Sequence, residues 1–207
     1  DPVTTTDELI PSGETSSYRS NPLGLAEFTL SRKDPEYVGL AKDMQKAQTA
    51  LMAGEDVFAA KEELGEVMEV IEKEFPDARE AGIGYGSTIF AVKPGDGSAR
   101  EQAASCQKVL GGWANIANEY ATKRYRSNLI NWGMLPFIIK EGELPFKRLD
   151  YLYLPNIRKA VEEKTDVIKC YAVVDSSLKE FEMTLGDLTN EERQIILDGC
   201  LINYNRV

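Results

Sequence analysis

The chain has 207 residues, of which 43% are hydrophobic, and its 34 acidic and 24 basic residues give a formal net charge of −10. This balance argues against nucleic acid as the main partner, because binding to a phosphate backbone depends on clustered Lys and Arg. No stretch approaches the roughly 20 apolar residues of a membrane helix, so no membrane partner is expected. Histidine is absent, which excludes a histidine base, a histidine-based triad and a typical zinc site.

Three cysteines, Cys106, Cys170 and Cys200, lie far apart in the sequence and form no CxxC pair. An odd number of cysteines cannot all pair in disulfides, and this usage is typical of a reducing compartment. We therefore expect a cytoplasmic protein, or one of the mitochondrial matrix if the source is eukaryotic. The first residue is Asp1 rather than methionine, and we expect the chain to be the C-terminal part of a longer protein.

The first 75 residues fall into two parts. Residues 1–24 are rich in Thr, Ser, Gly and Pro, which predicts an ordered loop rather than a helix. Further on, apolar residues recur at helical spacing up to Leu51 and again from Val57 to Ile71, with the break AGED between them. This pattern predicts a helical hairpin over residues 34–75. Its second helix carries an acidic face made by Glu62, Glu63, Glu66 and Glu69.

The central segment predicts a βαβ unit. The apolar run 88–92 is short and bounded by glycines, which indicates a buried strand, and KPGDG after it indicates a loop. A helix is expected over 98–110, ended by Gly111 and Gly112, with a second strand over 113–117. A strand, a helix and a returning strand imply parallel pairing through a right-handed crossover.

The C-terminal part mixes helices and strands in the same way. Further elements are predicted as a helix at 120–132, a strand at 134–139, an antiparallel pair at 167–174 and 178–185, and a last helix from Thr189 that includes Cys200 and Leu201. Thr189 and Glu192 have the spacing of a capping box. The whole pattern predicts the α/β class and a single domain over residues 1–207.

Residues 96–101, DGSARE, are the most informative stretch for function. Glycines allow a tight turn, and a helix begins directly after it, so that its first N–H groups and positive dipole end would face an anion. Ser98 and Arg100 are predicted to lie at the mouth of that anion site. A structural role competes with this interpretation, because Ser98 and Glu101 also have capping-box spacing. Taken alone, the spacing favours the cap.

Four motifs in order resemble the C-terminal swivel domain of the aconitase superfamily. GDGSAREQAASCQKVLGGWANI resembles the family signature GSSREHAA with its leucine-glycine-glycine turn and strand. ANEYATKRYRSNLINWGMLPF resembles the family helix that ends in asparagine-leucine and is followed by glycine-leucine-leucine-proline. VTTTDELIPSG resembles TTDHISPAG, and LTNEERQIILDGCLINY resembles the closing helix. Together they span almost the whole chain and outweigh the cap.

The resemblance implies a swivelling β/β/α domain, with the hairpin at 34–75 as an insertion, that closes over a cluster-bearing core. In the family, three cysteines of that core hold a [4Fe-4S] cluster, and the reaction is dehydration and rehydration of citrate and isocitrate through cis-aconitate. The cluster is therefore expected in partner domains, on the same polypeptide or a separate subunit, and the substrate is a small tricarboxylic or hydroxy acid. The cysteines of this chain are predicted core residues, so the isolated chain is expected to be inactive.

Functional roles follow from the resemblance by motif position. Ser98 matches the serine that removes the substrate's α-proton as an alkoxide, and Arg100 matches the arginine that stabilises it and contacts the substrate. Gly97 and Ala99 flank this serine and are predicted substrate contacts. An arginine fork suits this role, because it grips carboxylates bidentately and stays charged when desolvated.

A further family arginine binds a substrate carboxylate from the N-terminal part of the domain. Arg32, in FTLSRK, is the better match, and Arg19, in SYRSN, is the alternative. A surface or structural role for either arginine remains open at this point. Three other cations are assigned to surface or interdomain contacts, namely Lys123, Arg124 and Arg126.

The sequence departs from the family pattern at positions that bear on the substrate. The second serine of the motif is Ala99, and two family histidines are replaced by Gln102 and Glu8. Two other functions therefore stay open. One is the small subunit of an isopropylmalate or homoaconitate isomerase, and the other is an RNA-binding, apo-aconitase-like domain, against which the acidic balance counts.

Overall fold

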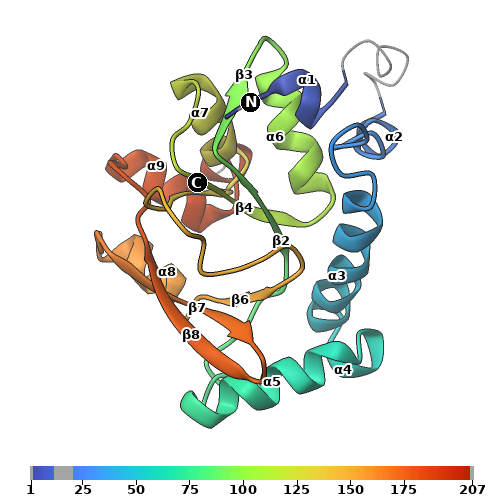
Figure 1. Cartoon of the computed structure of the whole chain (residues 1–207), viewed down its shortest axis with the longest axis vertical. Coiled ribbons are helices and arrows are strands. Elements are labelled where there is room, and N and C mark those ends of the chain that lie inside the picture. Colours follow the sequence, from blue (N-terminus) through green and yellow to red (C-terminus); the bar gives the residue numbers. More distant parts are fainter. Residues whose placement is uncertain (1, 12–20, 206–207) are drawn as a thin grey trace.

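The computed structural model of the protein describes residues 2–11 and 21–205. Strands and helices are mixed along the chain, which confirms the α/β class (Figure 1). The first half contains β1 (Val3–Thr5), α1 (Thr6–Leu9), α2 (Pro22–Ala26), α3 (Tyr37–Met52), α4 (Val57–Ala60), α5 (Glu63–Glu74), β2 (Ser87–Ala91) and β3 (Lys93–Asp96). The second half contains α6 (Arg100–Val109), β4 (Gly112–Ala117), α7 (Lys123–Asn131), β5 (Leu135–Ile138), β6 (Tyr151–Tyr153), α8 (Ile157–Glu162), β7 (Ile168–Val174), β8 (Ser177–Met183), α9 (Asn190–Asp198) and α10 (Leu201–Tyr204).

The strands form three small sheets. β2, β4 and β5 are parallel, and α6 lies between β2 and β4 in the chain, which confirms the predicted βαβ unit. β6, β7 and β8 are antiparallel, and the predicted pairing of β7 with β8 is confirmed. An isolated bridge between Ile138 and Thr184 connects these two sheets. The third sheet consists of β1 and β3.

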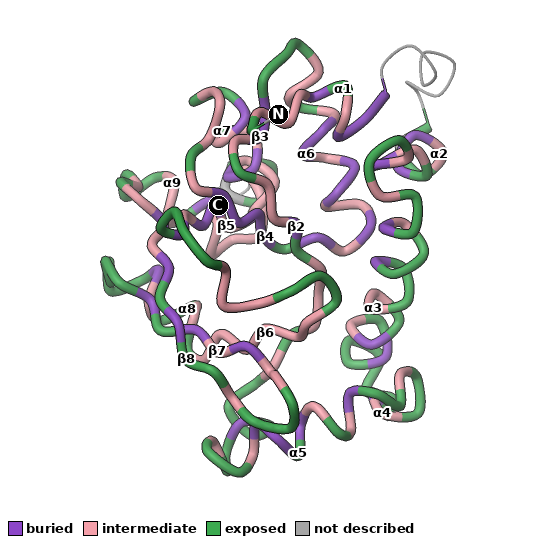
Figure 2. Tube along the Cα trace, viewed as in Figure 1, coloured by how far each residue is buried: buried purple, intermediate pink, exposed green. Residues whose placement is uncertain are grey.

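Two large hydrophobic cores lie in different parts of the molecule, and Figure 2 shows buried stretches in both. The first core gathers around α6 and α7 and includes the fully buried Leu9, Tyr125 and Leu129. The second lies between the parallel sheet and the antiparallel sheet and includes Phe137 and Cys170. The first core is the one that supports the loop between β3 and α6.

The predicted helical hairpin is present as α3 followed by α4 and α5. Its second arm is divided, because Lys61 has extended backbone angles at the end of α4. The four glutamates of the predicted acidic face are exposed. Two glutamines fasten α3 to the rest of the molecule, since Gln45 Nε2 donates to the Val109 carbonyl at 3.1 Å and Gln48 Oε1 accepts from the Tyr85 amide at 2.8 Å.

The prediction of loop for residues 1–24 is wrong where the structure describes them, because β1, α1 and α2 lie there. α1 begins with a capping box, in which Thr5 Oγ1 accepts from the Glu8 amide and Glu8 Oε2 accepts from the Thr5 amide at 2.7 Å. KPGDG is likewise no simple loop. Its first four residues form β3, which pairs in parallel with β1, a partner almost 90 residues earlier in the chain.

Other predictions need smaller corrections. β2 was predicted to be buried, but only Ile89 is buried in it, because its side chains line an open hollow described below. The last helix ends at Asp198, where Gly199 has a φ of +92°, and the half-buried Cys200 precedes the separate α10. β6 and α8 were not predicted. Within the described residues, no helix is both long and apolar enough to cross a membrane.

Candidate functional site

A small basic pocket lies between the first turns of α6 and α7, beside the loop that joins β3 to α6. Its volume is about 350 Å³. The side chains that line it come from both helices: Ser98, Arg100, Glu101, Lys123, Arg124, Ser127 and Asn128. The structure therefore brings together the two residues predicted to carry the chemistry. Two cations of α7, Lys123 and Arg124, also line the pocket, although the sequence analysis assigned them to surface or interdomain contacts.

Two glycines shape the loop that presents Ser98. Gly95 and Gly97 have φ angles of +103° and +128°, which residues with side chains rarely adopt. A Cβ on Gly95 would lie 2.4 Å from the ring of Tyr125, and a Cβ on Gly97 would lie 2.3 Å from Thr6 Oγ1. The loop is thus held closely between α7 on one side and α1 on the other.

Ser98 does not cap α6, so the capping-box interpretation is wrong. The helix begins at Arg100, Ala99 is its N-cap, and no side chain makes the cap hydrogen bond. The helix starts one residue too late for Ser98 and Glu101 to occupy the N-cap and N3 positions. Ser98 is exposed, and its hydroxyl has no hydrogen-bond partner among the described residues. The hydroxyl is available to a ligand.

Arg100 lies half-buried at the start of α6. Its Nε is buried and has no hydrogen-bond partner in the described part of the chain. An unmade hydrogen bond at a buried donor is costly. The residue also lines the pocket beside Ser98. The first turn of α6, which no side chain caps, presents its amide groups in the same region.

A closed network of three buried side chains lies behind the pocket. The Tyr125 hydroxyl donates to Asn115 Oδ1 at 2.5 Å, Asn115 Nδ2 donates to Gln107 Oε1 at 2.6 Å, and Gln107 Nε2 donates to Tyr125 Oη at 3.0 Å. These residues are at most 1% exposed. Burial raises the pKa of Tyr125, so its phenol stays a neutral donor. The network joins α6, β4 and α7 beneath the pocket.

Sequence reasoning missed the role that α7 plays in this pocket. Lys123 and Arg124 line it together with Ser98, although they were assigned to surface or interdomain contacts. No local sequence signal identifies them, because they are brought beside the loop by Thr122, whose hydroxyl caps α7 and also donates to the Gly95 carbonyl at 3.1 Å. Arg126 has an internal role instead, as described next.

Arg126 is a structural cation, which corrects its assignment to the surface or an interdomain contact. Its Nη2 donates to the carbonyls of Leu185 and Asp187 at 3.1 and 2.8 Å, and its Nη1 lies 3.9 Å from Glu192 Oε2. These contacts tie α7 to the start of α9. They leave Arg126 with its side chain turned away from the pocket that Arg124 lines.

The other predicted substrate contacts differ in their placement. Arg32 does not line the pocket, and its Nη1 lies 2.8 Å from Asp7 Oδ2 in α1. Arg19 lies outside the described residues. Ala99 packs against the first core, and Gly97 forms the turn before Ser98. The structure therefore supports Gly97 and Ala99 as parts of the loop, while it pairs Arg32 with a carboxylate of its own chain.

Glu8, which replaces a family histidine, is used within the chain. It completes the capping box of α1 and lies 2.8 Å from Lys33 Nζ. The hydrogen bond from Lys33 holds the pKa of this carboxyl below its usual range. Glu8 is therefore an ionised structural group that orients α1, the helix whose Thr6 abuts Gly97.

The chain's own residues do not fit an iron–sulfur cluster. Burial raises the pKa of Cys106 to about 11 and that of Cys170 to about 12, which opposes the thiolate form that binds metal. These two cysteines lie in different cores. Among the described residues, no group of three or more Cys, Asp or Glu side chains could hold a metal ion.

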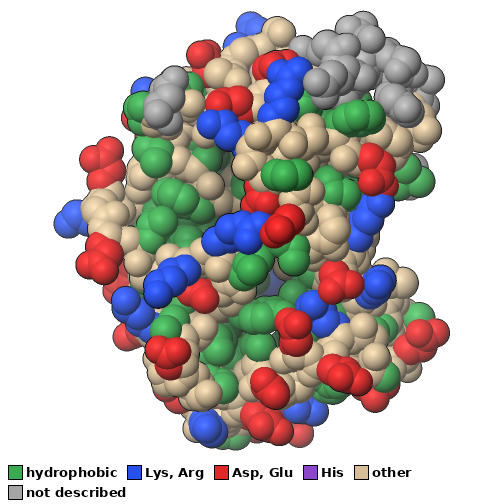
Figure 3. All heavy atoms as spheres, turned by 45° about the vertical axis from the view of Figure 1, so that its right-hand side comes forward, with side chains coloured by type: hydrophobic (Ala, Val, Ile, Leu, Met, Phe, Trp, Pro, Cys, Tyr) green, Lys and Arg blue, Asp and Glu red, His purple; other side chains and the backbone are tan. Residues whose placement is uncertain are grey.

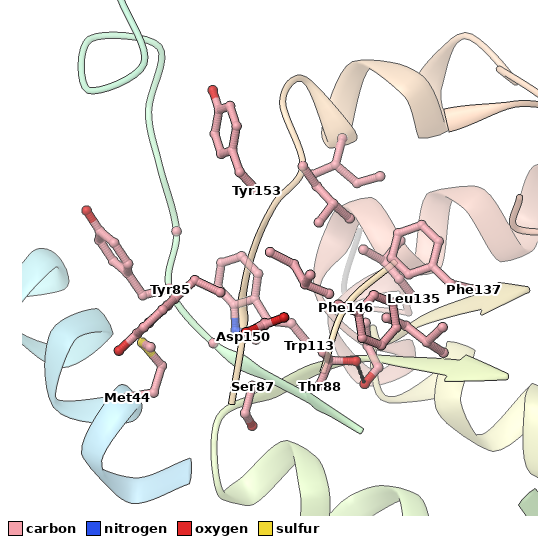
Figure 4. A pocket seen from close by; sticks show the side chains of 18 of the residues that line it. Met44, Tyr85, Ser87, Thr88, Trp113, Leu135, Phe137, Phe146, Asp150 and Tyr153 are labelled. Atoms are coloured by element: carbon pink, nitrogen blue, oxygen red, sulfur yellow. Dashed lines mark hydrogen bonds between the residues drawn. The ribbon is translucent and has the colours of Figure 1, made fainter. Parts of the chain in front are cut away.

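A second, much larger hollow of about 1740 Å³ lies apart from Ser98, between the hairpin and the two main sheets. Figure 3 shows hydrophobic side chains around an opening on this face, with charged side chains along the rim. In Figure 4, Tyr85, Trp113 and Asp150 lie near its centre. Tyr37 contributes a buried hydroxyl, and burial raises its pKa to about 12. None of the predicted site residues within the described part of the chain lines this hollow.

Comparisons with known proteins agree with the fold. It is similar to that of 3-isopropylmalate dehydratase (leuD) from Methanocaldococcus jannaschii, with a TM-score of 0.55 and 20% sequence identity, covering 99% of this chain and 91% of that chain. No curated protein matches the chain by sequence. The family model described as the aconitase C-terminal domain matches residues 34–142, just over half of the chain, and that range includes the hairpin, Ser98 and α7. The chain therefore belongs to the aconitase C-terminal domain family.

Proposed function

We propose that this chain is the substrate-closing domain of an aconitase-type hydro-lyase, which catalyses the reversible dehydration and rehydration of citrate and isocitrate through cis-aconitate. The observation that carries the proposal is the basic pocket in which the Ser98 hydroxyl and the Arg100 guanidinium lie together. Both residues fall inside the range matched by the aconitase C-terminal domain family. The family membership supports hydro-lyase chemistry, and the citrate specificity is part of the proposal.

Ser98 acts as the base in this proposal. Its Oγ, as an alkoxide, takes the proton from the substrate carbon next to a carboxylate, and the hydroxyl returns a proton in the reverse direction. A serine alkoxide is unstable in water, but fixed positive charge and amide dipoles can stabilise it in a site that excludes solvent. Arg100, the uncapped first turn of α6 and the cations of α7 supply this environment.

Arg100 binds a substrate carboxylate and stabilises the Ser98 oxygen. Arg100 lines the pocket together with Ser98, so the part of its guanidinium that faces the pocket can donate hydrogen bonds to a substrate oxygen. A guanidinium can form two parallel hydrogen bonds with one carboxylate, which fixes the substrate's orientation as well as its charge. Ala99, in place of the second family serine, supplies no hydroxyl donor, and its side chain packs against the first core.

The partner domains or subunit carry the [4Fe-4S] cluster in this proposal. The cluster, when bound there, supplies a Lewis-acidic iron for the substrate's hydroxyl and one carboxylate. The pocket of this chain is open on the side away from α6 and α7, so a docking partner is needed to exclude water from it. The isolated chain should therefore have no hydro-lyase activity.

The variant Ser98→Ala in the assembled enzyme tests the proposal. We expect turnover to fall by several orders of magnitude, on the order of the losses seen when a catalytic serine is removed. The fold should persist, because Ser98 is exposed and makes no hydrogen bond within the described chain. Steady-state rates with citrate and isocitrate, together with the unfolding midpoint, measure both effects.

The matched control is Ser105→Ala, a serine further along the same helix whose hydroxyl lies 3.4 Å from the Gln102 carbonyl. This variant should keep normal turnover. If Ser98→Ala also keeps near-normal turnover, Ser98 is not the base and the proposal fails.

A second candidate function is the small subunit of an isopropylmalate or homoaconitate isomerase. The observation in its favour is that the likeness to 3-isopropylmalate dehydratase extends over nearly all of both chains. The assembled enzyme should be assayed with citrate, isopropylmalate and homoaconitate in parallel. A kcat/KM that is highest for either of the latter two would replace the citrate assignment, while the role of Ser98 would stand.

A further inference from the structure

α7 contributes four residues to the lining of the basic pocket, and Lys123 and Arg124 are the charged ones. We propose that these two cations form a second carboxylate subsite, so that the pocket takes an anion with at least two carboxylates. Arg100 binds one carboxylate and the α7 pair binds another. This inference rests on the proposed function, because it concerns the same site and names residues that determine its specificity.

The charge pattern of α7 carries the argument. Arg126 is engaged by two carbonyls and Glu192, whereas Lys123 and Arg124 have no ion-pair partner among the described residues. Acidic residues outnumber basic residues in this chain by ten, and about half of the described cations have a carboxylate within 4 Å. Of the described side chains that line the pocket, Glu101 is the only acidic one, against three cations. An anionic ligand would relieve this local excess of positive charge.

A lining residue of the pocket also has a buried hydrogen-bond donor without a partner. Arg100 Nε is buried and has no partner, at a site whose volume of about 350 Å³ is near the lower end of the range for small-molecule pockets. Ser127 and Asn128, one turn along α7, add neutral groups that can donate hydrogen bonds to a carboxylate. The donors therefore come from two elements, the start of α6 and α7, and one ligand with two carboxylates can contact both.

The spacing of the two subsites is fixed by backbone contacts. The Ala121 amide donates to the Pro94 carbonyl at 2.9 Å, and the Thr122 hydroxyl donates to the Gly95 carbonyl at 3.1 Å. These bonds fasten the start of α7 to the strand and loop that carry Ser98. The distance between the Arg100 subsite and the α7 subsite is thus set before the ligand binds, which lowers the entropic cost of binding.

Isothermal titration calorimetry on the 207-residue chain at low ionic strength tests the inference, with citrate as the polycarboxylate and acetate as the monocarboxylate. The unmodified chain should bind citrate more tightly than acetate. The double variant Lys123→Gln/Arg124→Gln should weaken citrate binding by at least about tenfold, the effect of losing one charge-assisted contact. Its binding of acetate, held by Arg100, should not change.

The matched control is Lys179→Gln, which removes an exposed cation of β8 far from the pocket in the sequence and fold. Citrate binding should be unaffected by it. Three results would overturn the inference: equal affinity of the unmodified chain for citrate and acetate, unchanged citrate binding in the double variant, or an equal loss in Lys179→Gln. The last would indicate a general charge effect.

Failure of this inference can be told apart from failure of the proposed function. Ser98→Ala removes the base and should leave citrate binding to the chain within about twofold of normal, because the subsites use cations. If Ser98→Ala keeps turnover, the catalytic role fails even when the α7 subsite is confirmed. If the α7 variants bind citrate normally while Ser98→Ala is inactive, only the subsite fails.

Discussion

Different kinds of contact stabilise the walls of the two hollows in this molecule. The Ser98 pocket is small, basic and backed by a fully buried hydrogen-bond network of Gln107, Asn115 and Tyr125. The large hollow is about five times greater in volume and lined mainly by aromatic and aliphatic side chains. Its walls are fastened across the gap by exposed contacts, among them Arg148 with Asp34 and Tyr151 with Glu63.

This difference separates a rigid region from a loosely fastened one. Buried, mutually satisfied polar groups strengthen one another and specify one arrangement, whereas exposed ion pairs contribute little and are screened by salt. The loop that carries Ser98 lies on the rigid side, against Thr6 and Tyr125. The hairpin lies on the other side. The proposed base therefore lies beside the region that the buried hydrogen bonds hold together.

The largest expected effect comes from changing the cation of the rigid region. Arg100→Lys should lower kcat of the assembled enzyme by roughly 10²–10³-fold, the loss typical of removing one preorganised donor to a developing negative charge. Lysine keeps the charge but cannot form the bidentate fork. Steady-state kinetics with citrate measure this loss, and the unfolding midpoint of the variant should stay close to normal.

The control is Arg158→Lys, an exposed arginine of α8 that lies 3.6 Å from Glu162. Its kinetics should match those of the unmodified enzyme. An Arg100→Lys enzyme with unchanged kcat would mean that a point charge is sufficient, and the bidentate role of the guanidinium would have to be abandoned.

A smaller effect, on stability, is expected from the buried network. Tyr125→Phe keeps the ring against Gly95 but leaves Asn115 Oδ1 without its donor in a fully buried place. An unsatisfied buried acceptor costs about 1–3 kcal/mol. The free energy of unfolding, measured with urea, should fall by that amount, and the variant should also lose amide-exchange protection in α6 and α7.

The matched control is Tyr153→Phe, which removes a tyrosine hydroxyl from the region around the large hollow. Tyr153 lines the large hollow and packs its ring against Phe75 at a centroid distance of 5.3 Å. Removing its hydroxyl should change the stability by less than about 0.5 kcal/mol. Equal losses in the two variants would contradict the idea that hydrogen bonding makes one region more rigid than the other.

The sequence predicts local features of this fold well. The βαβ unit, the hairpin and the Thr189 capping box depend on periodicity, glycines and short-range spacing, and each is confirmed. Features that depend on residues far apart in the sequence cannot be predicted from local patterns. β3 was predicted as part of a loop because its strand partner, β1, lies almost 90 residues away.

The site was predicted in part, for the same reason. The motif placed Ser98 and Arg100 together because they are two residues apart in one turn. Lys123 and Arg124 reach the pocket only through the packing of α7 against α6, which leaves no mark in the local sequence. Arg32 could not be judged from sequence either, since its contact with Asp7 joins residues 25 positions apart.

The smallest expected effect belongs to the contact across the large hollow. Arg148 donates to Asp34 at 3.0 and 2.9 Å and to Glu36 at 2.9 Å, and it is about half exposed. The hydrogen bond from Arg148 holds the pKa of Asp34 below its ordinary value of 3.8. Arg148→Ala should therefore lower stability slightly at neutral pH and increase amide exchange at the start of α3, while α6 and α7 stay protected.

The stability lost in Arg148→Ala should depend on pH, because the pKa of Asp34 is lowered in the folded chain. A carboxyl whose pKa is lowered by folding adds stability above its unfolded pKa, and that stability is lost as the pH falls through the folded value. The gap between the unmodified chain and Arg148→Ala should thus be full at pH 7, shrink below about pH 4, and shrink at high salt. A gap that is the same at every pH and salt concentration would mean that the arginine stem, by packing, fastens the hairpin. The hairpin would then be held across the large hollow by apolar packing rather than by ion pairs. The two regions would differ in how deeply their contacts are buried, and not in the kind of contact.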